Sequence, residues 1–266
     1  MKSRPIASAI ILLFFCSLGL AQSQQDALDV LNKVAETYRS TKTLQAEADV
    51  QTEMNGQGVE QKVAAHMFLT VAAPGKFRME TKTGPAKILM IADGRTLWMY
   101  FPELNKYSKM PVGHDSGADA LSSAGLSTLG SLPDFSKVAE GVREARMLPS
   151  ETLQFDGVPI DCYVISVLQD LRPAAPGSDK AETAGVQPSN ETLWVDKSRL
   201  LILRLKSNVQ VTSTRSTVFF ETNSTVTFTK LALDEPLADD AFEFNPPQGA
   251  SELDFTQFMP QQSVPQ

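Results

Sequence analysis

The chain has 266 residues, of which 42% are hydrophobic and 21% are charged, and its formal net charge is −7. That length fits one large β domain or two small ones. A chain this acidic is a poor nucleic-acid binder, because phosphate binding needs clustered Lys and Arg, and it gains nothing from an anionic lipid surface.

The N-terminus has the parts of a secretory signal. A basic region precedes an apolar run over residues 6–20, and small residues precede a cleavage point after Ala21. The run is too short for a stable transmembrane helix. Cys16 raises the alternative of a lipoprotein signal, although Phe15 stands where that processing needs a small residue. We expect export, a charge of −9 (22 basic and 31 acidic residues) after cleavage, and no internal disulfide, because only Cys162 remains.

Hydrophobic spacing predicts a helix followed by strands. Apolar residues at helical spacing indicate a helix over residues 25–41. Alternation with period two then predicts a series of strands, with Asp93-Gly94 as a hairpin turn between two apolar runs. Residues 113–135 are rich in Gly, Ser and Ala, which predicts a weak helix or a mobile loop. A further helix is predicted over residues 133–145.

Strand patterns resume after this insertion and continue to the C-terminal region. Residues 171–190 are rich in Pro, Gly and Ala and are expected to form a flexible hairpin tip. The whole pattern predicts one helix, about ten or eleven antiparallel strands and a helical insertion, with no second core. We therefore expect a signal peptide at residues 1–21, one domain at 22–254 and a disordered tail at 255–266.

The residues offer little for catalysis. The chain has two histidines, His66 and His114, and neither has Cys or carboxylate neighbours at metal-ligand spacing. No nucleophile motif, glycine-rich phosphate loop or CxxC is present. Cys162 lies in an alternating strand pattern, which is typical of a small buried hydrophobe. We expect no enzyme activity, no metal and no cofactor.

Methionine is concentrated in the first half of the chain. Six of these residues are Met54, Met67, Met79, Met90, Met99 and Met110. Any single one fits an ordinary core, whereas the set also suits a surface that adapts to flexible apolar ligands, because the thioether side chain repacks easily.

Several segments together resemble a known family. An aromatic strand with Phe68-Leu69 is followed by a turn at Pro74, then by Phe77-Arg78-Met79, then by a strand pair around Asp93-Gly94, and the closing segment is Ala241–Asp254. This order resembles LolA, the periplasmic outer-membrane lipoprotein carrier, and the wider family of lipoprotein-sorting proteins.

The resemblance implies a fold, a location and a function. Family members are mainly β: a half-open antiparallel β-barrel of about eleven strands, with an N-terminal helix and a helical lid covering an apolar cavity. The implied protein is a monomeric periplasmic carrier that shields the acyl chains of a lipoprotein or lipid and meets transport partners at the inner and outer membranes. The alternative is a periplasmic interaction or sensor domain that binds a protein. One departure is Ala73, where proteobacterial carriers have an arginine that latches the lid.

Strand alternation and the resemblance together predict the ligand-binding residues. The cavity-facing set is Leu69, Val71, Phe77, Met79, Leu89, Ile91, Leu97 and Met99. Leu126 and Leu129 are assigned to the lid. A one-residue slip would replace Leu89 and Ile91 with Met90.

Overall fold

The computed structural model describes residues 8–56, 58–72, 75–84, 87–111, 135–169, 189–212 and 219–253. The helix is α1 (Ser8–Ser40), and two short 3-10 turns are η1 (Pro102–Leu104) and η3 (Phe135–Lys137). The first strands are β1 (Thr43–Gly56), β2 (Val59–Ala72), β3 (Lys76–Thr81), β4 (Leu89–Asp93), β5 (Thr96–Phe101) and β6 (Lys106–Pro111). The later strands are β7 (Val142–Phe155), β8 (Val158–Gln169), β9 (Ser189–Asp196), β10 (Ile202–Thr212), β11 (Phe219–Leu233) and β12 (Ser251–Glu252).

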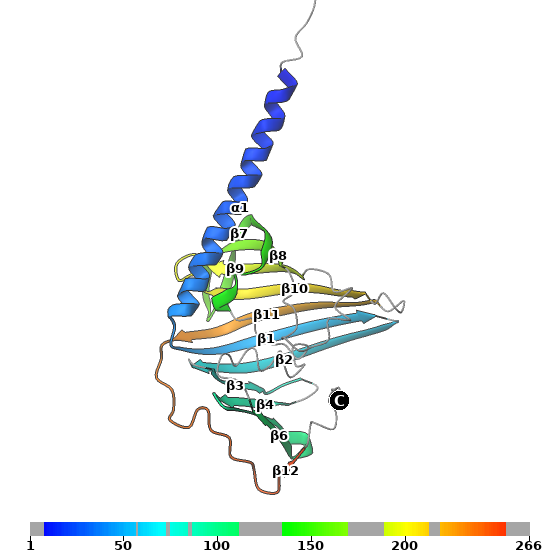
Figure 1. Ribbon diagram of the computed structural model, residues 1–266, viewed down its shortest axis with the longest axis vertical. Coiled ribbons are helices and arrows are strands. Elements are labelled where there is room, and N and C mark those ends of the chain that lie inside the picture. Colours follow the sequence, from blue (N-terminus) through cyan, green and yellow to red (C-terminus); the bar gives the residue numbers. More distant parts are fainter. Residues whose placement is uncertain are drawn as a thin grey trace, which may run out of the picture.

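These twelve strands form one sheet in the order β12-β6-β5-β4-β3-β2-β1-β11-β10-β9-β8-β7 (Figure 1). Neighbours are antiparallel except for the two-residue β12, which is parallel to β6. The two halves of the chain meet where β1 pairs with β11, and Leu44 lies opposite Leu233. The mainly β prediction is confirmed, but the sheet is open: in the described residues β12 and β7 remain its two ends.

The C-terminal half of α1 packs on one face of the sheet, which we name the core face. Tyr38 lies 5.1 Å from Phe135 of η3 between ring centroids, and Phe135 lies 6.0 Å from Phe228 of β11. The backbone N–H of Ile202 donates to the Tyr38 hydroxyl at 3.2 Å. The buried apolar residues of α1 recur at helical spacing, which explains why this segment is a helix on a sheet; they are Ala27, Leu31, Val34 and Ala35.

Two helix predictions differ from the structure. The helix predicted over residues 25–41 begins already at Ser8, and α1 extends beyond the sheet (Figure 1). No helix in the described part of the chain has the length and apolarity to cross a membrane. The helix predicted over residues 133–145 was wrong: η3 covers only Phe135–Lys137, and β7 begins at Val142. Pairing of β7 with β8 along most of its length overrides local helix propensity there.

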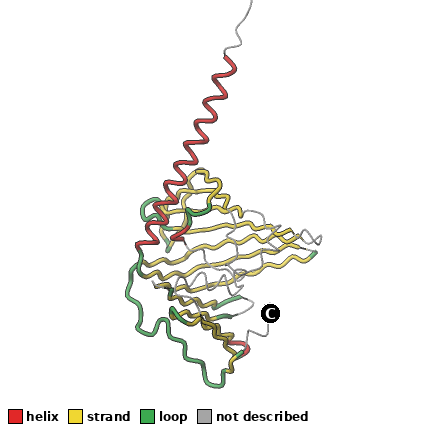
Figure 2. Tube along the Cα trace, in the orientation of Figure 1, coloured by secondary structure: helices red, strands yellow, loops and turns green. Residues whose placement is uncertain are grey.

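The chain returns from β11 to the far end of the sheet through residues 234–250, which we name the strap. In Figure 2 the strap runs outside the strands to β12. Its start is fixed because the carboxylate of Asp234 accepts hydrogen bonds from the N–H groups of Lys42 and Thr43. Its end is fixed where the N–H of Leu253 donates to the carbonyl of Tyr107 at 2.6 Å. The C-terminal segment is thus tied to both ends of its path.

Candidate functional site

The Asp93-Gly94 turn sets the register of the strands that carry the predicted site. One carboxylate oxygen of Asp93 accepts hydrogen bonds from the N–H groups of Arg95 and Thr96, each at 2.7 Å. Gly94 has φ of 92°, a conformation that favours glycine. The predicted hairpin is therefore present, and it brings β4 and β5 together with Met90 opposite Met99.

A row of methionines crosses the core face. Met79 lies opposite Met90 on the neighbouring strand, and Met90 lies opposite Met99. Residues directly opposite one another in an antiparallel pair share a face, so these side chains form a ladder across β3, β4 and β5. A second row runs alongside it through Phe77, Ala92 and Leu97. We name these six residues the methionine ladder; each is only 0–4% exposed.

The ladder continues onto β2 and β1. Leu69 lies opposite Met79, and Val71 lies opposite Phe77, so both predicted residues are on the core face, although they are only half-buried. Leu69 in turn lies opposite Ala46 of β1. Six predicted residues therefore share one face: Leu69, Val71, Phe77, Met79, Leu97 and Met99. Their role in ligand binding stays a prediction.

The assignment of Leu89 and Ile91 to the same face was wrong. Leu89 lies opposite Tyr100, and Ile91 lies opposite Trp98, so both belong to the other face of the sheet, which we name the outer face. Ile91 is 1% exposed but lies outside the continuous core cluster. Met90 lies on the core face instead, which is the alternative that a one-residue slip predicted. Counting through a two-residue turn from Met99 would have found it.

Leu126 and Leu129, the predicted lid residues, lie outside the described residues, as does Ala73. The same holds for most of the predicted hairpin tip at residues 171–190. The strands on either side of that tip, β8 and β9, do pair in antiparallel fashion, with Gln169 opposite Ser189.

The outer face carries an aromatic cluster that the strap covers. The ring of Phe244 lies 5.3 Å from Trp98, 6.0 Å from Tyr100 and 5.8 Å from Tyr107, measured between centroids. The hydroxyl of Tyr100 donates to the side-chain oxygen of Asn105 at 3.1 Å. These contacts explain why a strand with apolar residues on both faces is stable: the core covers one side and this chain's own C-terminal segment covers much of the other.

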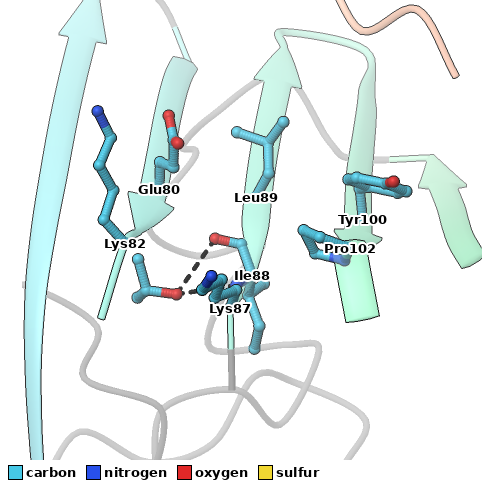
Figure 3. Close-up of a pocket in the computed structure, with 8 residues that line it drawn as sticks. Glu80, Lys82, Lys87, Ile88, Leu89, Tyr100 and Pro102 are labelled. Carbon is cyan, nitrogen blue, oxygen red and sulfur yellow. Dashed lines mark hydrogen bonds between the residues drawn. The ribbon is translucent and has the colours of Figure 1, made fainter. Parts of the chain in front are cut away.

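Beside this cluster the outer face has a hollow of about 380 Å³. Figure 3 shows its lining: Glu80, Thr81, Lys82, Lys87, Ile88, Leu89, Tyr100 and Pro102. The hydroxyl of Thr81 accepts from the N–H of Ile88 at 2.8 Å, which holds the edge of the hollow together. Sequence reasoning missed this feature, because the residues that line it come from three strands, from the connection between β3 and β4, and from η1.

Polar groups elsewhere in the described residues have structural roles. Asp196 accepts hydrogen bonds from the turn residues Ser198 and Arg199, the closest at 2.6 Å. Burial raises the pKa of Asp196, but these hydrogen bonds outweigh it and hold the pKa below its usual range. Burial raises the pKa of the Cys162 thiol to about 11 and also raises that of Glu191. No group of three or more His, Cys, Asp or Glu placed to hold a metal is found among the residues described.

Comparison with known proteins adds a family to this geometry. The family model described as outer membrane lipoprotein carrier protein LolA matches residues 39–123, a segment that includes β1 to β6 and therefore the whole ladder. The segment over residues 39–123 is therefore LolA-like. An outer-membrane lipoprotein carrier protein of Coxiella burnetii is 29% identical over 125 residues, 46% of this chain. That match spans just over half, 56%, of the carrier's own length.

Two other similarities extend beyond the LolA-like segment. An uncharacterized protein of Methanocaldococcus jannaschii, MJ0687, is 23% identical over 248 residues, which is 91% of this chain and 59% of that protein. The crystal structure of the LolA superfamily protein NE2245 from Nitrosomonas europaea is 13% identical, with a TM-score of 0.35, and the match covers 82% of this chain and 97% of that one.

Proposed function

We propose that this protein is an exported, periplasmic carrier of acylated ligands, which shelters the acyl chains of a lipoprotein or lipid against the methionine ladder on its way toward the outer membrane. The observation that carries the proposal is the ladder itself. Its six apolar side chains lie on one face and within the segment that matches a family of lipoprotein carriers. The export proposal rests on the N-terminal segment. Cleavage after Ala21 would leave Ala27, Leu31, Val34 and Ala35, the buried apolar residues in the described part of the helix, in place.

The chemistry of the ladder suits an acyl chain. Methionine is unbranched and polarizable, so neighbouring thioethers repack around ligands of different length at little cost. Each buried methylene contributes roughly 0.8 kcal/mol, so a sixteen-carbon chain would gain about 10 kcal/mol before ordering costs are subtracted. That gain is large enough for solubilisation in water, and it is still compatible with release to a membrane partner.

Ligand entry requires the ladder to become accessible, because its side chains are buried. The lid proposed around Leu126 and Leu129 lies in the connection between β6 and η3. Both ends of that connection are on the core face: Met110 packs against the core and Phe135 belongs to it. A lid without an arginine at position 73 would open more readily than that of proteobacterial carriers.

Two glutamate substitutions on opposite faces test the proposal. Met99→Glu places a carboxylate within the ladder, whereas Leu89→Glu places one on the outer face, where the side chain is half-buried. Uptake of a fluorescent fatty acid, and native mass spectrometry of protein purified from a membrane-containing extract, report ligand binding. We expect Met99→Glu to abolish uptake and Leu89→Glu to leave it nearly unchanged.

Circular dichroism must first show that both variants are folded. If Met99→Glu does not fold, Met90→Trp serves instead, because an added ring fills the ladder without a charge at a cost of about 1–3 kcal/mol. Equal uptake by the ladder and outer-face variants would contradict the assignment of the site. Absence of any acyl ligand in the native protein would contradict the carrier function and favour a protein-binding domain.

A further inference from the structure

A row of polar side chains crosses the core face on β1, β11, β10 and β9, which are neighbours in the sheet (Figure 1). Thr52 lies opposite Ser224, Ser224 lies opposite Ser207, and Ser207 lies opposite Glu191. Residues directly opposite one another in antiparallel strands share a face. We name these four residues the polar row, and all four are half-buried.

The polar row lies on the same face as the methionine ladder. Met79 of the ladder lies opposite Leu69, and Leu69 lies opposite Ala46 of β1. Thr52 follows six positions after Ala46, and an even separation within a strand keeps both side chains on one face. At about 3.3 Å per residue the two positions are about 20 Å apart. An acyl chain fills one leaflet of a hydrocarbon core about 30 Å thick, so the separation is comparable with the length of one chain.

Apolar residues flank the polar row on both sides. Val50 and Met54 of β1 share the core face with Thr52, because alternate residues of a strand point the same way. Leu205 and Val209 flank the row on β10 in the same manner. Ligand pockets typically have this composition: they are mostly apolar, and a few polar groups fix the orientation of the ligand.

Glu191 is the one charged member of the polar row. Its surroundings are apolar, since Val167 lies opposite it on β8 and Leu193 follows on its own strand, each at most 2% exposed. Asp196 is satisfied by its own turn, whereas the one side-chain hydrogen bond that Glu191 accepts in the described part of the chain comes from the Ser189 hydroxyl at 3.4 Å. Burial raises the pKa of Glu191 more than this bond lowers it. A carboxylate in such surroundings is stabilised by a cationic or hydrogen-bond-donating partner.

We propose that the polar row binds the head group of the acylated ligand and selects an ammonium head over a carboxylate head. This inference rests on the proposed carrier function and concerns the other end of the same ligand. An ammonium group has three donors, which the carboxylate of Glu191 and the hydroxyl oxygen of Ser207 can accept. A carboxylate head has no donor and is repelled by Glu191.

The acyl chain of such a ligand extends along the core face toward the ladder. Phe228 lies opposite Ala48, between Thr52 and the end of β1 that continues the ladder. Its ring contacts Phe135 of η3. The chain therefore replaces this ring contact, which is part of the opening that access to the ladder already requires.

Two glutamine substitutions with the same change in net charge test the selection. Glu191→Gln removes the charge from the polar row, and its amide oxygen can still accept from Ser189. Glu53→Gln is the control, because Glu53 adjoins Thr52 on β1 but is exposed on the outer face. Isothermal titration of the full-length chains at pH 7 and low salt uses dodecylammonium, monolauroylglycerol and laurate. These probes have chains of equal carbon number and differ in the head, and each is kept below its aggregation concentration.

We expect the unmodified chain and Glu53→Gln to bind dodecylammonium at least tenfold more tightly than laurate, with monolauroylglycerol between them. Glu191→Gln should lower this preference to less than threefold. If circular dichroism shows that Glu191→Gln is not folded, Ser207→Lys serves instead, because a cation in the row neutralises Glu191 and should cause the same loss.

The outcomes separate this inference from the carrier function. Equal affinity for the three heads, or an equal loss of preference in Glu53→Gln and Glu191→Gln, would overturn the selection by the polar row and leave the carrier function intact. Binding of none of the three probes would contradict the carrier function and this inference with it.

Discussion

Adjacent residues of β4 provide the sharpest test of the strand register. Met90 points into the ladder and is 1% exposed, whereas Leu89 is half-buried beside the outer hollow. Truncating a fully buried methionine to alanine typically costs 2–5 kcal/mol. Since Met79 and Met99 can relax into the space, we expect Met90→Ala to lower the free energy of unfolding by about 2–3 kcal/mol. Leu89→Ala should cost about 1 kcal/mol, because less of its surface is removed from water.

Thermal unfolding followed by circular dichroism measures this difference. A loss of 1 kcal/mol lowers the melting temperature by about 2–4 °C in a domain of this size, so we expect roughly 8 °C for Met90→Ala and about 3 °C for Leu89→Ala. Urea titrations should show lower midpoints with unchanged slopes, which would exclude a change in the unfolded state. If Leu89→Ala were the more destabilising of the two, the register argued from the turn would be wrong.

Three further outcomes follow from other contacts. Phe244→Ala should lower the free energy of unfolding by about 2 kcal/mol, because three ring contacts are lost. The fluorescence emission of Trp98 should shift to longer wavelength. Unchanged emission would show that the strap does not cover the Trp98 ring. The lowered pKa of Asp196 means that its carboxylate stabilises the fold above the unfolded value near 3.8 and that this contribution disappears as the pH falls through the folded pKa. Asp196→Asn should therefore lower the free energy of unfolding by about 2 kcal/mol at pH 7. The difference in unfolding free energy between the variant and the unmodified protein should become smaller below about pH 4. A difference independent of pH would contradict this role of Asp196. In a Cys16→Ser background, Cys162 should react with a thiol reagent at pH 8 only after denaturant is added, because burial raises its pKa to about 11; rapid labelling of the folded protein would disprove this.

Much of the fold could be predicted because short-range patterns specify it. Period-two alternation indicated the strands, and Asp93-Gly94 indicated the hairpin, since few residues other than glycine adopt the turn conformation at low cost. Six of the ten predicted site residues lie on one face. Within a single strand, alternate residues must point to one face or to the other, so only two assignments are possible. The prediction of a helix over residues 133–145 was wrong, because the pairing of β7 with β8 outweighed the local helix propensity.

The sequence by itself therefore determined the elements, the LolA-like character of the segment with β1 to β6, and the apolar surplus of its strands. The tertiary structure decided which part of the molecule covers each apolar face of these strands. The side of β4 that meets the core depends on pairing across a turn, so Leu89 and Ile91 exchanged places with Met90. The cover over Trp98 comes from Phe244, almost 150 residues later in the chain.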